Sequence, residues 1–166
     1  MFDRFEQDLH KRGSDQIVQS WKNELTSLKG LPLKDMADKV NRYINQTPYI
    51  LDQDNWGISD YWATPIEFFK NGGDCEDFAI AKYAALRMLG VPESRLRLAI
   101  VHDNEKDIPH AVLIIYTNTN AYILDNQEEN LVNAAYEERY RPIFSINRSA
   151  WWLHTMPDNT VLASAQ

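Results

Sequence analysis

Apolar residues in the first half of the chain recur every three or four positions, which is the spacing of one helix face. We predict a short helix over residues 2–11 and a second one that is capped by Ser14 and ended by Gly30. A third begins at Pro32, and its apolar stripe consists of Leu33, Met36, Val40, Tyr43 and Ile44. Thr64-Pro65-Ile66-Glu67 has the pattern of a capping box with proline at the first helical position, which predicts a fourth helix.

The second half of the chain changes to strand patterns. Alternating apolar residues predict five strands, over residues 95–101, 110–116, 121–124, 142–146 and 150–154. The polar stretches 102–107 and 126–140 are predicted to be loops, the latter with some helix. Because the helices come first and the strands after, the sequence predicts an α+β fold with one antiparallel sheet, formed as a single domain over residues 1–166.

A long loop is predicted over residues 49–63, where Asp, Asn, Gly and aromatic residues replace the helical pattern. Loops of this length in compact domains are often functional. The aromatic side chains of this segment either wall a substrate groove or cover the core beneath it, and the pattern does not decide between these two roles.

The only cysteine lies in Asn71-Gly72-Gly73-Asp74-Cys75-Glu76-Asp77-Phe78-Ala79, where an almost uniformly apolar helix over residues 77–89 begins. Such a helix is usually central and buried. Cys75 is therefore expected at or just before its first turn, where unpaired N–H groups and the helix dipole favour a thiolate. A lone cysteine is often only a small buried hydrophobe. Here the preceding glycine pair and the flanking carboxylates favour a nucleophile.

Three carboxylates, those of Asp74, Glu76 and Asp77, crowd this cysteine and would raise the pKa of its thiol. The nearest basic residues in sequence are Lys70 and Lys82. A hard cation with oxygen ligands, calcium above all, would offset the negative charge. The alternative is an acidic first turn that only complements the helix dipole. The spacing is compatible with both.

A histidine and an acid are expected to meet on the predicted hairpin. If Tyr116 faces Ala121 across a turn centred on Asn118-Thr119, His110 projects from the same face as Asp125 and is its diagonal neighbour. The carboxylate can then orient the imidazole while the other ring nitrogen faces the thiol.

The other three histidines are weaker candidates for a catalytic base. His102 is the alternative, because it ends a strand beside acidic residues, but its neighbours indicate a mobile loop. His10 and His154 lie in terminal segments where no pairing suggests an acid partner. His110 is therefore the predicted base.

Composition excludes several classes of function. The net charge of -7 argues against nucleic acid as a partner, because phosphate binding needs basic patches. No apolar run approaches the length of a membrane span, and the start of the chain has no signal-peptide pattern. If the protein is exported, its targeting segment is expected to lie outside this sequence. A single cysteine also excludes an internal disulfide.

The order Cys75, His110, Asp125 resembles the transglutaminase-like, papain-related superfamily. Within it, the sequence is similar to the bacterial transglutaminase-like cysteine proteinases, the LapG family of periplasmic proteases, from about Trp21 to Leu153. Four segments carry this resemblance: Asn55-Trp56-Gly57, Tyr61-Trp62-Ala63-Thr64-Pro65, Gly72-Gly73-Asp74-Cys75-Glu76-Asp77-Phe78-Ala79, and His110-Ala111-Val112 with Leu124-Asp125-Asn126. The implied fold has N-terminal helices and a central cysteine-bearing helix packed on an antiparallel sheet.

The resemblance also implies an activity and partners. Members of this family are calcium-dependent endoproteases of the Gram-negative periplasm. They cleave the N-terminal region of a large surface adhesin at a pair of alanines, which releases the adhesin and disperses biofilm. An inner-membrane receptor for cyclic di-GMP sequesters the protease. Carried onto this chain, the resemblance assigns Cys75, His110 and Asp125 to catalysis, Asp74, Glu76 and Asp77 to calcium, and Trp56 with Gly57 to the substrate cleft.

Two other functions are compatible with these residues. A transglutaminase-like acyltransferase would use the same three catalytic residues with an amine as acceptor in place of water. A non-catalytic module would use the acidic loop to bind a metal or a partner protein. The complete set of Cys, His and Asp favours an enzyme, and the protease is the predicted function.

Overall fold

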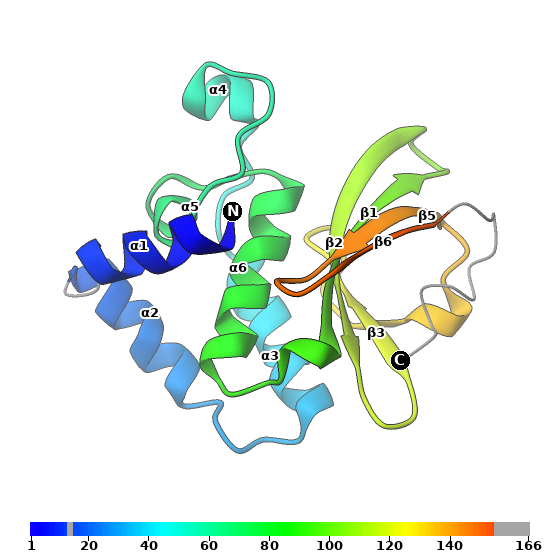
Figure 1. Cartoon of the computed structure of the whole chain (residues 1–166), viewed down its shortest axis with the longest axis horizontal. Coiled ribbons are helices and arrows are strands. Elements are labelled where there is room, and N and C mark those ends of the chain that lie inside the picture. The colour runs from blue at the N-terminus through cyan, green and yellow to red at the C-terminus, as the bar shows by residue number, and fades with distance from the viewer. Residues whose placement is uncertain (13–14, 155–166) are drawn as a thin grey trace.

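The computed structural model describes residues 1–12 and 15–154, and its helices gather on one side of a six-stranded sheet (Figure 1). The α-helices are α1 (Phe2–Arg12), α2 (Gln16–Thr26), α3 (Leu33–Ile44), α4 (Asp52–Trp56), α5 (Pro65–Asn71) and α6 (Cys75–Met88). Two short 3₁₀ helices are η1 (Glu93–Arg95) and η2 (Ala134–Tyr136). Helix α4 projects away from the other helices, at the top of Figure 1.

The sheet has the strand order β4-β3-β2-β1-β5-β6, and its five strand pairings are all antiparallel. The strands are β1 (Leu96–Asp103), β2 (Ile108–Tyr116), β3 (Ala121–Leu124), β4 (Val132–Asn133), β5 (Tyr140–Ile146) and β6 (Trp151–Leu153). Helices followed by one antiparallel sheet confirm the predicted α+β fold.

Helix α6 is the centre of the molecule, and its residues from Asp77 to Tyr83 are all buried. It packs against β1 and β2, and the main core cluster joins its Ile80 and Leu86 to Leu113 and Ile115 of β2. The intervening strand residues, such as Ile114, belong to a second cluster on the other face of the sheet. This division follows from the alternation of side chains along a strand.

Three helices begin close to where the capping rules predicted, and only the cap of α2 is a different residue from the predicted one. The Thr64 side chain and the Glu67 carboxylate form the expected capping box at the start of α5. Pro32 occupies the N-cap of α3. Helix α2 is capped by Asp15, whose carboxylate accepts from the N–H of Ile17 at 3.1 Å; Ser14, the predicted cap, lies outside the described residues.

Two predicted loops are more ordered than their composition suggested. The loop over residues 49–63 contains helix α4, which ends at Gly57 with a positive φ of 72°. Strand β1 continues through His102 to Asp103 instead of ending at Val101, because these polar residues pair with β2 on one side and β5 on the other. Within the described part of the chain, no helix is long and apolar enough to cross a membrane.

Candidate active site

Cys75 is the first residue of α6, and the two preceding glycines allow the chain to turn sharply onto it. Gly72 has a positive φ of 79°, and a Cβ there would lie 2.6 Å from the carbonyl oxygen of Pro48. A Cβ on Gly73 would lie 2.3 Å from Oδ2 of Asp77. The N–H of Ile50 donates to the carbonyl of Gly73 at 2.9 Å, which joins this turn to the chain just before α4. A side chain at either position would collide with a neighbouring residue, so both positions require glycine.

Asp77 fixes the geometry of this turn from the inside. Its Oδ1 accepts from the N–H of Ala63 at 2.7 Å, and its Oδ2 accepts from the N–H of Asp74 at 3.3 Å. The side chain is fully buried, and burial raises its pKa to about 7. One of the three acids predicted to hold calcium is therefore also a structural element of the cysteine turn.

The predicted pairing of His110 with Asp125 is present. Tyr116 faces Ala121 in the β2–β3 register as expected, and Nε2 of His110 lies 2.8 Å from Oδ1 of Asp125. Both side chains are buried. The hydroxyl of Tyr140 donates to the other carboxylate oxygen, Oδ2. Burial by itself raises the pKa of Asp125, but hydrogen bonds from His110 and other donors outweigh it and hold that pKa below its usual range.

Cys75 and His110 line the same cleft, which has a volume of about 310 Å³ and also includes Tyr49, Ile108 and Gln127. The backbone of Ala111, the residue after His110, lies close enough to the Cys75 sulfur to lower the pKa of the thiol, although burial outweighs this effect. The structure therefore brings together all three residues predicted for catalysis, which come from α6, β2 and the end of β3.

The thiol of Cys75 is held in its protonated form by its surroundings. Its Sγ donates to Oε2 of Glu76 at 2.9 Å. Burial raises the pKa of the thiol above its usual range, and the negative charge of Glu76 adds to the effect. The predicted conflict between a thiolate and its acidic neighbours is thus present in the folded protein.

The acidic residues around Cys75 are joined by two more from the α4 region. Among the described residues, Asp52, Asp74 and Asp77 place carboxylate oxygens within 4.8 Å of one another, and so do Asp52, Asp60 and Glu76. Asp52 and Asp60 were not predicted as ligands, although their segment was noted for its acidic residues. They approach the cysteine turn through contacts that sequence periodicity does not reveal, such as those of residues 48–50 with Gly73 and of Asn55 with Gly72.

This acidic cluster fits a cation. The Oδ1 atoms of Asp52 and Asp74 are buried and have no hydrogen-bond partner. Burial, together with the neighbouring carboxylates, raises the pKa of Asp74 to about 8. Oxygen ligands of this kind are those that Ca²⁺ prefers. Asp52, Asp74, Glu76 and Asp77, with Asp60 at the exposed edge, are the residues that could hold it.

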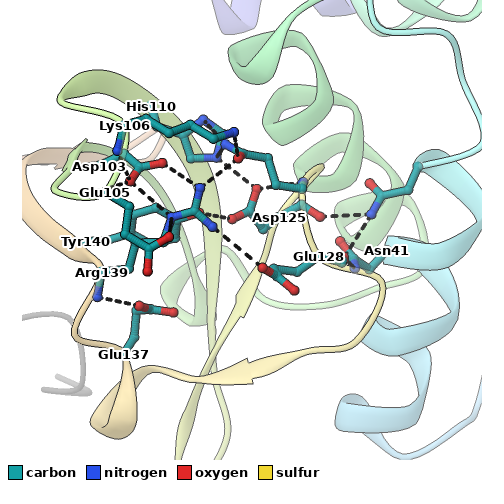
Figure 2. Close-up of polar contacts among 12 residues, drawn as sticks. Asn41, Asp103, Glu105, Lys106, His110, Asp125, Glu128, Glu137, Arg139 and Tyr140 are labelled. Carbon is teal, nitrogen blue, oxygen red and sulfur yellow. Dashed lines mark hydrogen bonds and ion pairs between the residues drawn. The ribbon is translucent and has the colours of Figure 1, made fainter.

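The sequence pattern does not reveal the polar residues that surround the histidine. Gln127 places its Nε2 within 3.1 Å of the His110 ring, and its Oε1 accepts from Nη2 of Arg139 at 2.8 Å. Figure 2 shows Arg139 among acidic side chains, beside the pair formed by His110 and Asp125. The position of Gln127 two residues after Asp125 was the only available signal, because Arg139 and Tyr140 arrive from a distant strand.

The remaining candidates lie outside the cleft. Trp56 packs against Tyr61 at 4.6 Å between ring centroids, and neither it nor Gly57 is among the residues that line the cleft, so their role in substrate binding stays a prediction. His102 contacts Asp107 at 2.9 Å through Nε2. His154 contacts the hydroxyl of Ser145, and His10 is exposed on α1.

Comparisons with known proteins agree with this arrangement. The profile of the family described as bacterial transglutaminase-like cysteine proteinase BTLCP matches residues 4–157. Calcium-bound LapG of Legionella pneumophila superposes with a TM-score of 0.78 at 33% identity, covering 93% of this chain and 90% of that one. EGTA-treated LapG gives 0.78 and 33%, covering 93% and 87%. A third LapG structure from this organism gives 0.77 and 34%, covering 95% and 91%.

No match was found among curated proteins. The family profile spans most of the chain, and the superposition on LapG extends over both the helices and the sheet. The fold is therefore of the papain/transglutaminase-like type, and the chain belongs to the bacterial transglutaminase-like cysteine proteinases.

Proposed function

We propose that this protein is a calcium-dependent cysteine endoprotease of the periplasm in which Cys75 is the nucleophile, His110 the general base and Asp125 the residue that orients it. The observation that carries the proposal is the buried hydrogen bond of 2.8 Å between His110 and Asp125, in a cleft that also holds Cys75 at a helix N-terminus. Membership of a cysteine protease family supports the same assignment.

The tautomer of His110 follows from its partner. A carboxylate can only accept, so the ring hydrogen lies on Nε2, which faces Asp125, and Nδ1 keeps a free lone pair. Nδ1 can take the proton of the Cys75 thiol as the sulfur attacks the scissile carbonyl carbon. The resulting imidazolium is stabilised by the negative charge of Asp125.

The remaining steps return the enzyme to its starting state. The tetrahedral adduct collapses to an acyl-enzyme when the carbon–nitrogen bond breaks, and Nδ1–H protonates the leaving amine. Water then attacks the thioester and gives its proton to Nδ1. The peptide acid leaves, and Cys75 recovers its proton. Backbone N–H groups at the start of α6 are suitable donors for the oxyanion.

Asp52, Asp74, Glu76 and Asp77 would hold calcium beside the nucleophile. When bound, the ion supplies positive charge that offsets the acidic groups around the thiol. The existence of calcium-bound and EGTA-treated forms of LapG supports calcium as the cation for this cluster. The two orphaned carboxylate oxygens in this chain support it independently.

We further propose the substrate and partner that the family resemblance implies. The substrate is the N-terminal region of a large surface adhesin, cut at a pair of alanines, and its release promotes biofilm dispersal. The regulatory partner is an inner-membrane receptor for cyclic di-GMP that sequesters the protease.

The test uses purified protein with an adhesin N-terminal fragment that carries the di-alanine site. We expect one cut at that site with calcium, little cutting with chelator, and none by Cys75→Ala at an unchanged thermal stability. A fragment with both alanines replaced should resist cleavage. Full activity of Cys75→Ala would end the proposal, and incorporation of an added amine into the product in preference to water would identify an acyltransferase instead.

A further inference from the structure

Gln127 lies in the cleft beside the proposed base and has no role in the mechanism above. It follows Asp125 by two residues, and its backbone N–H donates to Oδ1 of that aspartate at 3.0 Å. The same oxygen is within hydrogen-bond distance of Nε2 of His110. The main chain of Gln127 thus helps to fix the carboxylate, and its side chain turns back toward the histidine.

The amide of Gln127 lies over the face of the imidazole. Its Nε2 is 3.3 Å from Nδ1 and 3.1 Å from Nε2 of His110. The two ring nitrogens flank Cε1, so a position in the ring plane this close to both would overlap that carbon. The amide nitrogen therefore sits above the ring, which leaves the in-plane lone pair of Nδ1 free.

Two cations determine which end of the Gln127 amide faces the histidine. Its Oε1 accepts from Nη2 of Arg139 at 2.8 Å and from Nζ of Lys106. Both partners are donors only, so the oxygen faces them and the NH₂ group is directed to His110. The orientation of the amide is fixed by its partners.

Arg139 is in turn held by a buried acid. It donates to Oδ1 of Asp103 at 3.0 Å through Nε and to Oδ2 at 2.6 Å through Nη2. This bidentate pair, with backbone donors from Glu105 and Lys106, lowers the pKa of Asp103 to about 2, so the acid stays charged at neutral pH. Figure 2 shows Arg139 beside Asp103, and this charged pair supports the neutral amide of Gln127.

We propose that Gln127 is a positioning residue that covers one face of the His110 ring, keeps Nδ1 directed into the cleft, and shields the bond between His110 and Asp125 from water, with Arg139 and Asp103 fixing the direction of its amide. The inference rests on the proposed function, because it assigns Gln127 a role in the same reaction. Without this cover, the ring can rotate about its side-chain torsions, and Nδ1 spends less time aligned with the thiol.

The test compares Gln127→Leu with Gln7→Leu, an exposed control on α1. Gln127→Leu keeps the bulk of the side chain but loses the amide, which contacts the His110 ring and accepts from Arg139 and Lys106. For Gln127→Leu we expect kcat to fall by about 10- to 100-fold with KM within about threefold of the wild type, as for a misdirected catalytic group. Thermal stability should be close to that of the control. A rise in KM with unchanged kcat would overturn the proposal and make Gln127 a substrate contact.

A second readout does not depend on turnover. The Nε2 proton of His110 should give a downfield NMR signal in the wild type, because it is buried and hydrogen-bonded to Asp125. In Gln127→Leu this signal should broaden through faster exchange with water, and in Gln7→Leu it should not. An equally sharp signal in Gln127→Leu would contradict the shielding role. If the wild type neither cleaves substrate nor shows a reactive Cys75, the proposed function fails, while this signal still decides the role of Gln127.

The support from Arg139 is tested by non-additivity. If Arg139 acts through Gln127, the double variant Gln127→Leu with Arg139→Met should be no slower in kcat than the less active of the two single variants. Fully additive losses would show that Arg139 acts by another route. Should Arg139→Met fail to fold because Asp103 loses its partner, Gln127→Glu provides the second variant. It keeps an acceptor for Arg139 but loses the donor to the ring, so kcat should again fall.

Discussion

The two sides of the cleft compensate their charges in different ways. On the histidine side, formed by His110, Asp125, Gln127, Arg139 and Tyr140, the buried carboxylate accepts hydrogen bonds at both oxygens, and its pKa is held low. On the cysteine side, formed by Asp52, Asp74, Cys75, Glu76 and Asp77, the acids repel one another, two oxygens have no partner, and pKa values are raised.

This difference indicates that the protein builds the two sides by different means. The histidine side is completed by the chain itself, through side chains from β2, from the segment after β3 and from the start of β5. The cysteine side has negative charge in excess of its own donors, which a bound cation can balance.

The largest effect is expected from His110→Ala. Removing the general base should lower kcat/KM by about 10²- to 10⁴-fold, because His110 is the only histidine among the described residues that line the cleft. His10→Ala, at an exposed position on α1, should retain full activity. Peptide cleavage followed by chromatography measures both. Comparable activity in the two variants would remove His110 from the mechanism.

Calcium should stabilise the folded protein through the cysteine side. At a hundred times its Kd, calcium should add about 2–3 kcal/mol to the free energy of unfolding, since a ligand that binds only the folded state stabilises by mass action. Asp52→Asn should lose most of this gain, whereas Asp54→Asn, an exposed neighbour on α4 outside the cluster, should keep it. Thermal unfolding with calcium and with chelator measures the gain. An equal gain in both variants would place calcium elsewhere.

Gly73→Ala should disturb the cysteine side by steric overlap. The new Cβ would displace the Asp77 carboxylate, so we expect a loss of about 1–3 kcal/mol in stability and weaker calcium binding. Gly30→Ala is the control, because Gly30 has a positive φ of 89° but open space around it. It should lower stability through backbone strain alone and leave the calcium gain unchanged. Equal calcium gains in the two variants would argue against Asp77 as part of the cation site.

The smallest effect is a slope in stability with pH. Burial holds the folded-state pKa of Asp77 at about 7 and that of Asp74 at about 8, above the usual value of roughly 3.9 in an unfolded chain. Between the unfolded and folded pKa values, these two acids bind more protons in the folded state than in the unfolded state. Their contribution to stability is therefore greatest at low pH and falls as pH rises. In chelator we expect each of the two acids to lower the free energy of unfolding by about 1 kcal/mol per pH unit from pH 5 to 7. Calcium should flatten this slope. A stability that rises with pH in chelator would contradict the raised pKa values of Asp74 and Asp77.

The parts of the site that were predicted correctly depend on local rules. Hairpin register alone placed His110 beside Asp125, because side chains alternate strictly along a strand. Helix-terminus signals placed Cys75 at or just before the first turn of the central helix, and it is the first residue of α6. The α+β class followed from the order of periodic segments. Each of these inferences uses residues that are close in sequence.

The parts that were missed depend on contacts between distant segments. Asp52 reaches Asp74 because residues 48–50 lie against Gly73, a contact that no periodic pattern encodes. Asp103 was placed in a loop because it is polar, but its pairing with Arg139, 36 residues later, allows it to be buried in β1. Lys82, a basic residue in the helix predicted to be almost uniformly apolar, is fully buried, and this burial lowers its pKa to about 7.

The most direct test of this contrast is the rate at which iodoacetamide alkylates Cys75 across pH, with calcium and with chelator. The cation should offset the negative charge of Glu76 and Asp74, so calcium should shift the alkylation profile to lower pH and give fast labelling near neutrality. In chelator, labelling should require alkaline pH. His110→Ala would identify the share of this shift that needs the imidazole. Identical profiles with calcium and with chelator would contradict the account, because the cysteine side would then be complete without a cation.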